Sequence, residues 1–222
     1  MSAWTVRRRG TDSSGRGIYA SDYMWEVWLA VLAHPLIQPF ADKIVITQGA
    51  WMTVAGGGAK GSAGYHDGGG CFDLRVWNLT DNEVRTLIRV LRMFGIAAWL
   101  RDKVHGGFTD AHIHLVLGTD HDLDDGAAWQ WSQYLAGRNG LASSGPDYHW
   151  RPSPLVTTPP EDDMPYTEKQ LTDLMRAAVR AELDAASLDD LAAVEAKRYA
   201  NLNGKINEIV SKVRSLFAKA SS

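Results

Sequence analysis

The sequence predicts an α+β domain, in which a small antiparallel sheet is flanked by helices, followed by an all-α C-terminal region. Short apolar runs that alternate every second residue recur between segments of helical periodicity in the first 150 residues. All nine tryptophans precede a proline-rich and acidic stretch, and the residues after it are rich in Ala, Leu, Lys and Glu. We therefore expect a first domain over 1–150, a linker over 151–164 and a helical region over 165–222.

Three helices are expected in the first domain. The first begins with a cap at residues 21–22 and ends near His34. The second opens with a capping box at 80–83 and stops at Gly95. The third is short and covers 127–136. The apolar faces of these helices predict that they form the scaffold of the core.

Four segments alternate like strands, or are short apolar runs between turn signals, namely 43–48, 71–77, 96–101 and 112–117. Side chains of a strand repeat on one face every second residue, so His112 and His114 share a face. The loop over 55–64 is made of small residues, which suits either the rim of a cleft or a disordered connector.

His66 and Asp73 are a nitrogen and an oxygen ligand separated by a glycine-rich bend. A bend that leads into a strand can bring His66 back beside Asp73, and His114 joins them if the two strands are neighbours. Two imidazoles and one carboxylate leave a fourth position open, which is typical of a catalytic zinc ion. A lone histidine in a strand or a run of glycines is weak evidence alone, and the spacing of the whole set gives the prediction its weight.

The order H-x6-D followed by H-x-H resembles the zinc peptidases that include D-Ala-D-Ala carboxypeptidases, MepA-type murein endopeptidases and the Hedgehog signalling domain. The usual first motif is S-x-H-x-x-G-x-A-x-D. His66, Gly69 and Asp73 match it, whereas Cys71 stands at the Ala and Gly64 at the Ser. The resemblance covers the range from about 40 to 153 and implies a Hedgehog-like fold.

Three shorter stretches strengthen the resemblance. Residues 111–114 resemble the second motif, and 62–70 together with 99–101 resemble related domains in phages of actinobacteria. The resemblance implies a phage endolysin, a zinc-dependent peptidase that cleaves peptidoglycan peptides containing D-amino acids. It implies Zn2+ as the cofactor, peptidoglycan as the partner, and residence in the host cytoplasm until release to the cell wall.

The sequence departs from the family at two positions. Many relatives carry Glu or Asp three residues before the last ligand, where this chain has Ala111. Trp51 stands where the carboxypeptidases have an arginine that helps to hold the substrate. These departures favour a rival hypothesis, in which the chain is a non-catalytic or virion-associated wall-binding module that keeps the zinc site.

Asp110 and His112 are the candidate catalytic bases. Asp110 could reach a bound water from the end of its loop, or it could orient an imidazole instead. His112 shares a strand face with His114. Trp99 and Arg101 are candidate substrate-binding residues, and Arg101 could hold a substrate carboxylate with two hydrogen bonds. The alternatives for this pair are a core aromatic and a surface arginine.

Composition excludes several classes of protein. The formal net charge of −3 gives no reason to expect nucleic-acid binding. The triplet 7–9 of arginines is expected to be a solvated terminus, and no signal peptide or transmembrane segment is predicted. The one cysteine, Cys71, rules out a disulfide within the chain.

The region 165–222 contains an apolar seam at spacings of three and four residues, formed by Tyr199, Leu202, Ile206, Ile209, Val213 and Leu216. A helix of this length is marginal alone, so the seam must be buried. We expect a homo-oligomer held by these helices. An excess of Lys and Arg around the seam also fits attachment to an anionic wall or membrane surface.

Overall fold

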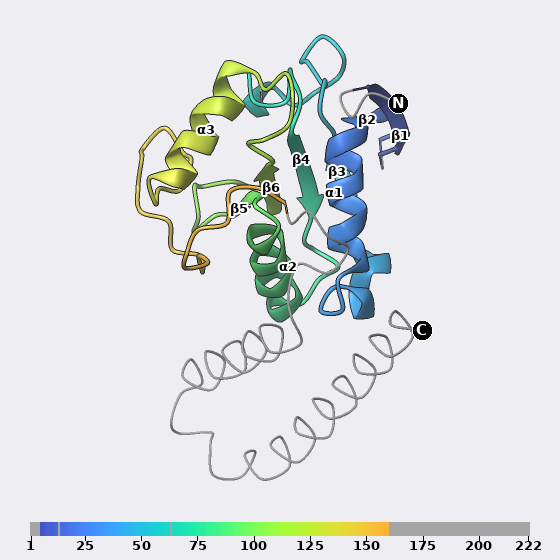
Figure 1. The fold of residues 1–222 in the computed structure, drawn as a ribbon. Coiled ribbons are helices and arrows are strands. Elements are labelled where there is room, and N and C mark those ends of the chain that lie inside the picture. The colour runs from blue at the N-terminus through green and yellow to red at the C-terminus, as the bar shows by residue number, and fades with distance from the viewer. Residues whose placement is uncertain (1–4, 13, 63, 160–222) are drawn as a thin grey trace, which may run out of the picture. The chain divides into compact units, whose positions relative to one another are not determined.

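The computed structural model describes residues 5–12, 14–62 and 64–159, which form the coloured part of Figure 1. The chain divides into two units, Met1–Glu161 and Asp162–Ser222. The predicted helical region over 165–222, with its oligomer seam, lies outside the described residues. No helix among the described residues is long and apolar enough to span a membrane.

A four-stranded antiparallel sheet with strand order β3-β4-β6-β5 forms the centre of the first unit. Its strands are β3 (Ile46–Gln48), β4 (Cys71–Arg75), β5 (Ala97–Arg101) and β6 (His112–Val116). The α+β prediction is confirmed for this unit. β3 is shorter than expected because Lys43 ends a 3-10 helix, η1 (Gln38–Lys43).

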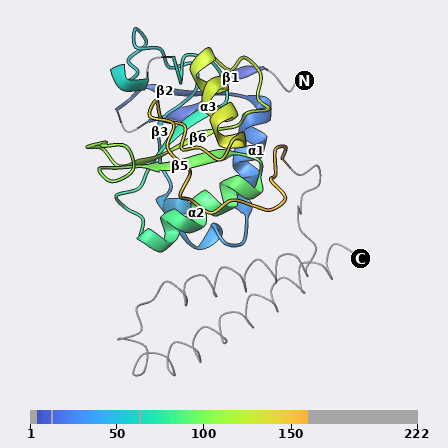
Figure 2. The same cartoon turned by 90° about the vertical axis from the view of Figure 1, so that its left-hand side faces the viewer.

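Three α-helices flank the sheet at the predicted places: α1 (Asp22–Ala33), α2 (Asp81–Met93) and α3 (Asp125–Leu135). The capping box of α2 is complete, because Thr80 and Glu83 each accept a backbone N–H from the other. Figure 2 shows α2 and α3 on opposite sides of β5 and β6, so helices cover both faces of the sheet.

The N-terminal segment forms a hairpin of β1 (Val6–Thr11) and β2 (Gly17–Ser21) that was not predicted. The arginines at 7–9 lie in β1, where Arg7 and Arg8 are exposed as expected and Arg9 is partly buried. The Arg7 Nε donates to Asp22 Oδ1 at 2.9 Å, and Arg9 contacts the same carboxylate. Charged residues on both sides of an exposed strand hide the alternation from which a strand is predicted.

One face of the sheet is apolar and carries α1 and α2. On β4 and β6 it consists of fully buried side chains, Phe72, Leu74, Ile113 and Leu115. Trp28 of α1 meets Phe72 edge to face, with ring centroids 5.9 Å apart. Full burial of one such side chain stabilises the fold by about 1.5–3 kcal/mol, so this face supplies the main core.

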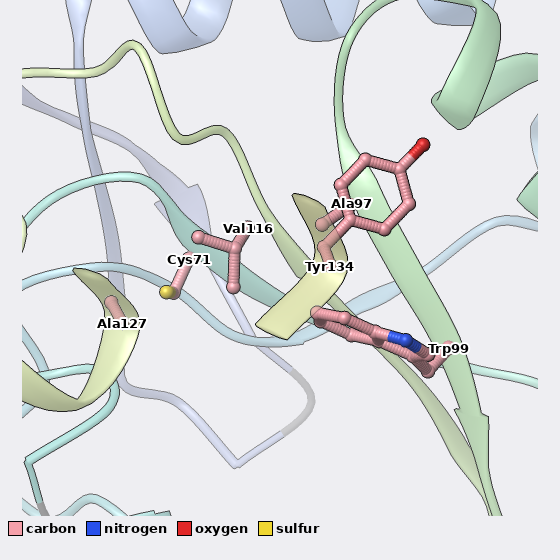
Figure 3. Close-up of a cluster of buried hydrophobic side chains, with 6 residues drawn as sticks. All are labelled: Cys71, Ala97, Trp99, Val116, Ala127 and Tyr134. Carbon is pink, nitrogen blue, oxygen red and sulfur yellow. The ribbon is translucent and has the colours of Figure 1, made fainter. Parts of the chain in front are cut away.

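The other face of the sheet carries a second apolar cluster, which lies under α3 and is shown in Figure 3. Cys71, Val116 and Ala97 are cross-strand partners on β4, β6 and β5. From α3, Ala127 and Tyr134 close over this row, and Trp99 lies beside it. The cluster anchors α3 to the sheet and leaves the remaining part of this face for polar residues.

Candidate metal centre

Strand register places most of the predicted site residues in two adjacent rows on the face under α3. Asp73, His114 and Trp99 are cross-strand partners in the first row. Directly opposed residues of neighbouring strands point to the same side of the sheet. The next row, two residues along each strand, consists of Arg75, His112 and Arg101.

The glycine-rich bend delivers His66 to the first row, as predicted. Gly69 N donates to the Asp122 carbonyl oxygen at 2.7 Å. A Cβ on Gly69 would lie only 2.2 Å from the carbonyl oxygen of His121, so no larger residue fits against this loop. Gly70 has φ of +77°, a conformation that L side chains rarely adopt. The glycines therefore allow the chain to turn sharply between the two ligands.

His66, Asp73 and His114 form a buried group that can bind a metal ion. His66 Nε2 lies 3.3 Å from His114 Nδ1 and 3.4 Å from Asp73 Oδ1. His114 Nδ1 lies 2.8 Å from the same Asp73 oxygen. The predicted convergence of the three residues is therefore confirmed.

Hydrogen bonds on the far side of each ring fix which nitrogen faces the centre. His66 Nδ1 lies 3.0 Å from the carbonyl oxygen of Gly49, which can only accept, so Nδ1 carries the proton. His114 Nε2 lies 2.7 Å from Gln130 Oε1, which also only accepts. The opposite nitrogens, His66 Nε2 and His114 Nδ1, are left with lone pairs that face Asp73.

The lone pairs of His66 Nε2, His114 Nδ1 and the Asp73 carboxylate therefore face one another with no N–H group between them. Such an arrangement needs a cation or a shared proton. Zinc with bonds of about 2.0–2.1 Å to a tetrahedral ligand set separates its ligands by about 3.3 Å. The two separations that involve His66, 3.3 and 3.4 Å, agree with this spacing. The donor set therefore fits a zinc ion, and each imidazole already has its outer partner.

The pKa values of the group show how strongly its members interact. Burial alone raises the pKa of Asp73, but the positive charge that the neighbouring imidazoles, His66 above all, carry when protonated holds it well below its usual value. Burial alone lowers the pKa of His66, whereas the negative charge of Asp73 raises it overall. Burial lowers the pKa of His114. The carboxylate is therefore ionised and available as a ligand.

An open pocket of about 220 Å³ lies over the centre. His112 lines this pocket, and its Nε2 lies 3.8 Å from Asp73 Oδ1. His112 Nδ1 donates to the backbone carbonyl of Asp110 at 2.7 Å. Nε2 is therefore an acceptor. The Asp110 residue is exposed, and the contact it makes with His112 comes from its backbone.

The two predicted substrate-binding residues lie in different environments. Trp99 is fully buried and stacks on the ring of His114, with the ring centroids 6.4 Å apart. It therefore packs against a residue of the candidate metal centre, as the core-aromatic alternative predicts. Arg101 lines the pocket but is only 3% exposed, so it is not a surface arginine. Its Nη1 donates to the Asn139 carbonyl at 2.8 Å, while its buried Nη2 has no hydrogen-bond partner.

Two residues that support the centre were missed from the sequence. Gln130 holds His114 from α3. Asp124 caps α3 through Ala127 N, and its other oxygen accepts the N–H groups of Asp67 and Gly68 in the bend. A capping aspartate before the helix was a readable signal for Asp124. No local pattern distinguishes Gln130 from a solvent-facing glutamine.

Comparisons with protein-family models, curated proteins and solved structures found no match for this chain. The geometry of the centre and the motifs in the sequence are therefore the features of this chain that bear on its function.

Proposed function

We propose that the first unit is a zinc-dependent peptidase that hydrolyses peptide bonds in bacterial peptidoglycan, and that the chain is a phage endolysin. The observation that carries this proposal is the meeting of three lone pairs, from His66, Asp73 and His114, beneath an open pocket. The resemblance of the two ligand motifs to those of cell-wall zinc peptidases supports the substrate class.

His66, Asp73 and His114 would hold the zinc ion, which would lower the pKa of a bound water towards neutrality and so supply the nucleophile. His112 is the general base in this proposal, since its Nε2 is an acceptor that faces the same pocket. Asp110 acts through its carbonyl, which fixes the tautomer of His112. This assigns different roles to the two residues that the sequence left unranked.

Arg101 binds an anionic group of the substrate in this proposal. Burial lowers the pKa of Arg101 only to about 10, so the side chain stays charged at neutral pH. A buried charged nitrogen without a partner is unfavourable, and a carboxylate in the pocket would supply that partner. Peptidoglycan stem peptides end in a carboxylate, which fits this requirement.

The proposal is tested by loss of turbidity of purified cell walls, with the full chain and with and without a chelator. We expect lysis that the chelator stops and zinc restores. His112→Ala should keep its zinc, measured by metal analysis, and lose about 10²–10⁴-fold in lysis rate. His121→Ala, which changes an exposed histidine on another loop, is the matched control.

Metal analysis of His66→Ala, Asp73→Ala and His114→Ala completes the test. About one zinc per chain is expected in the parent, with a loss in all three variants. Full zinc occupancy in these variants would reject the site. If His112→Ala lyses cell walls at the rate of the parent, His112 is not the base, and the metal-site assignment is unaffected.

A second candidate function is a wall-binding module that keeps its zinc without cleaving. One observation favours it: among the described residues that line the pocket, Asp73 is the only acid, and it is a ligand. A carboxylate base like that of many relatives is therefore missing from the described wall of the pocket. In this case the parent chain sediments with cell walls, and their turbidity and soluble peptide content stay constant.

A further inference from the structure

We infer that Gln130 is the positioning residue of the metal centre, holding His114 in the tautomer that presents Nδ1 to the metal. Gln130 lies on α3 and His114 on β6, and both are buried. The inference rests on the metal site of the proposed function and not on peptidase activity. Helix α3 supplies none of the three metal-binding residues, but through Gln130 it affects how tightly the centre binds a metal ion.

The orientation of the Gln130 amide follows from its two partners. Its Nε2 donates to the carbonyl oxygen of Gly140 at 3.2 Å. Since that carbonyl cannot donate, the NH2 end of the amide must face Gly140 and the oxygen end must face the histidine. Gln130 Oε1 lies 2.7 Å from His114 Nε2, so the His114 proton resides on Nε2.

The other tautomer of His114 is incompatible with a metal at this centre. A proton on Nδ1 would point at Asp73 Oδ1, 2.8 Å away, and at His66 Nε2, 3.3 Å away. Nδ1 would then have no lone pair to offer. Outer partners of metal-binding histidines typically change metal affinity by about 10–100-fold, and we expect an effect of this size for Gln130.

Gln130 also has a structural contact that must be separated from this role. Through Gly140 it fastens a loop that forms one wall of the pocket, and Arg101 binds the same loop at Asn139. The two roles use different atoms of one side chain. The amide oxygen serves His114, and the amide nitrogen serves the loop, so substitution can remove one atom at a time.

Gln130→Glu and Gln130→Met make this separation. Glu keeps an oxygen for His114 and places a second oxygen against the Gly140 carbonyl, where it cannot donate. Met keeps neither hydrogen bond at nearly the same length. If positioning is the role, Gln130→Glu binds zinc at least as tightly as the parent, and Gln130→Met binds about 10–100-fold more weakly. If the loop contact alone matters, Gln130→Glu is at least as impaired as Gln130→Met.

The matched control is Gln133→Met on the same helix. Gln133 pairs with the Ser144 hydroxyl at 3.1 Å, away from the centre, so its zinc affinity should equal that of the parent. Zinc affinity is measured on the full chain by competition with a chromophoric chelator. Folding of each variant is checked by circular dichroism.

Imidazole 15N chemical shifts of the zinc-free full chain report the tautomer directly. We expect the proton of His114 on Nε2 in the parent and in Gln130→Glu, with a shift towards Nδ1 in Gln130→Met. An unchanged tautomer together with unchanged zinc affinity in Gln130→Met would overturn the inference. If the parent binds no zinc, the metal proposal fails, and the tautomer measurement still decides the role of Gln130.

Discussion

The two faces of the β4–β6 pair show how one short sequence pattern serves two purposes. On the face under α1 and α2, Phe72 and Leu115 are fully buried and apolar. One residue along each strand, Asp73 and His114 face the opposite side and converge on the candidate metal centre. Because side chains alternate, a slip of one residue in register would put the ligands into the core and the apolar residues at the centre.

The comparison extends to the buried histidines on the two sides. His34, at the end of α1, meets Phe94 edge to face, and its Nε2 has no hydrogen-bond partner. Burial lowers its pKa to about 4. His66 is equally buried, yet its pKa is raised, because Asp73 outweighs the effect of burial. Burial therefore keeps His34 neutral on the core side, whereas the charge of Asp73 raises the pKa of His66 on the other side.

Phe72→Ala should show the largest effect, and it acts on the core face alone. Removal of a buried aromatic side chain is expected to lower the free energy of unfolding by about 3–5 kcal/mol. Urea titration of the zinc-free chain measures this loss. The zinc content per folded molecule should stay at the parental value. A folded Phe72→Ala chain without zinc would show that the two faces are not independent.

His34 should give the core side a dependence of stability on acid of about 3 kcal/mol. Its pKa is about 4 in the folded chain and about 6.5 when unfolded. Above pH 6.5 the residue is neutral in both states, so its contribution to stability is fully present. As the pH falls towards 4, His34 binds a proton in the unfolded chain before it does so in the folded chain. The free energy of unfolding therefore drops, by about 3 kcal/mol at pH 4.

The measurement compares urea unfolding of the parent and of His34→Leu at several pH values between 7 and 4. The variant lacks the titrating group, so its stability should fall less steeply with acid over this range. Equal slopes in the two proteins would mean that the pKa of His34 is the same in the folded and the unfolded chain.

Zinc binding should raise the free energy of unfolding by a smaller amount, which depends on the free zinc concentration. At a free zinc concentration 100-fold above Kd, the free energy of unfolding should rise by about 2.7 kcal/mol. The same increment is expected in Phe72→Ala, because its ligands are intact. Asp73→Ala should gain nothing. Thermal unfolding with and without zinc measures these increments, and an equal gain in Asp73→Ala would mean that zinc binds elsewhere.

The sequence predicted those parts of the fold that depend on neighbours along the chain. The cap at Ser21, the capping box at Thr80 and the alternation around Asp73 and His114 are local patterns, and the structure confirms all of them. The candidate metal centre was predictable for the same reason. Two short motifs contain all three residues of the group: one runs from the glycine-rich bend into β4, and the other lies on β6.

The parts that escaped prediction depend on how elements dock. Gln130 becomes a partner of His114 only when the Cys71 cluster holds α3 against the sheet. The burial of Arg101 depends on a loop about 40 residues later in the chain. The β1 strand pairs with β2 through backbone groups, and its charged residues suggested only a solvated terminus from composition. Such contacts leave no periodic signal in the sequence.

The position of Cys71 has a consequence for following the motions of this chain. It is the only cysteine, it is fully buried, and it lies two residues before Asp73 on the same strand. Burial also raises the pKa of its thiol, so it stays protonated and unreactive while covered. A thiol reagent can reach it only when the strand and α3 separate. The rate of its modification therefore reports how often the strand that carries Asp73 opens, provided that the reagent reacts faster than the strand closes.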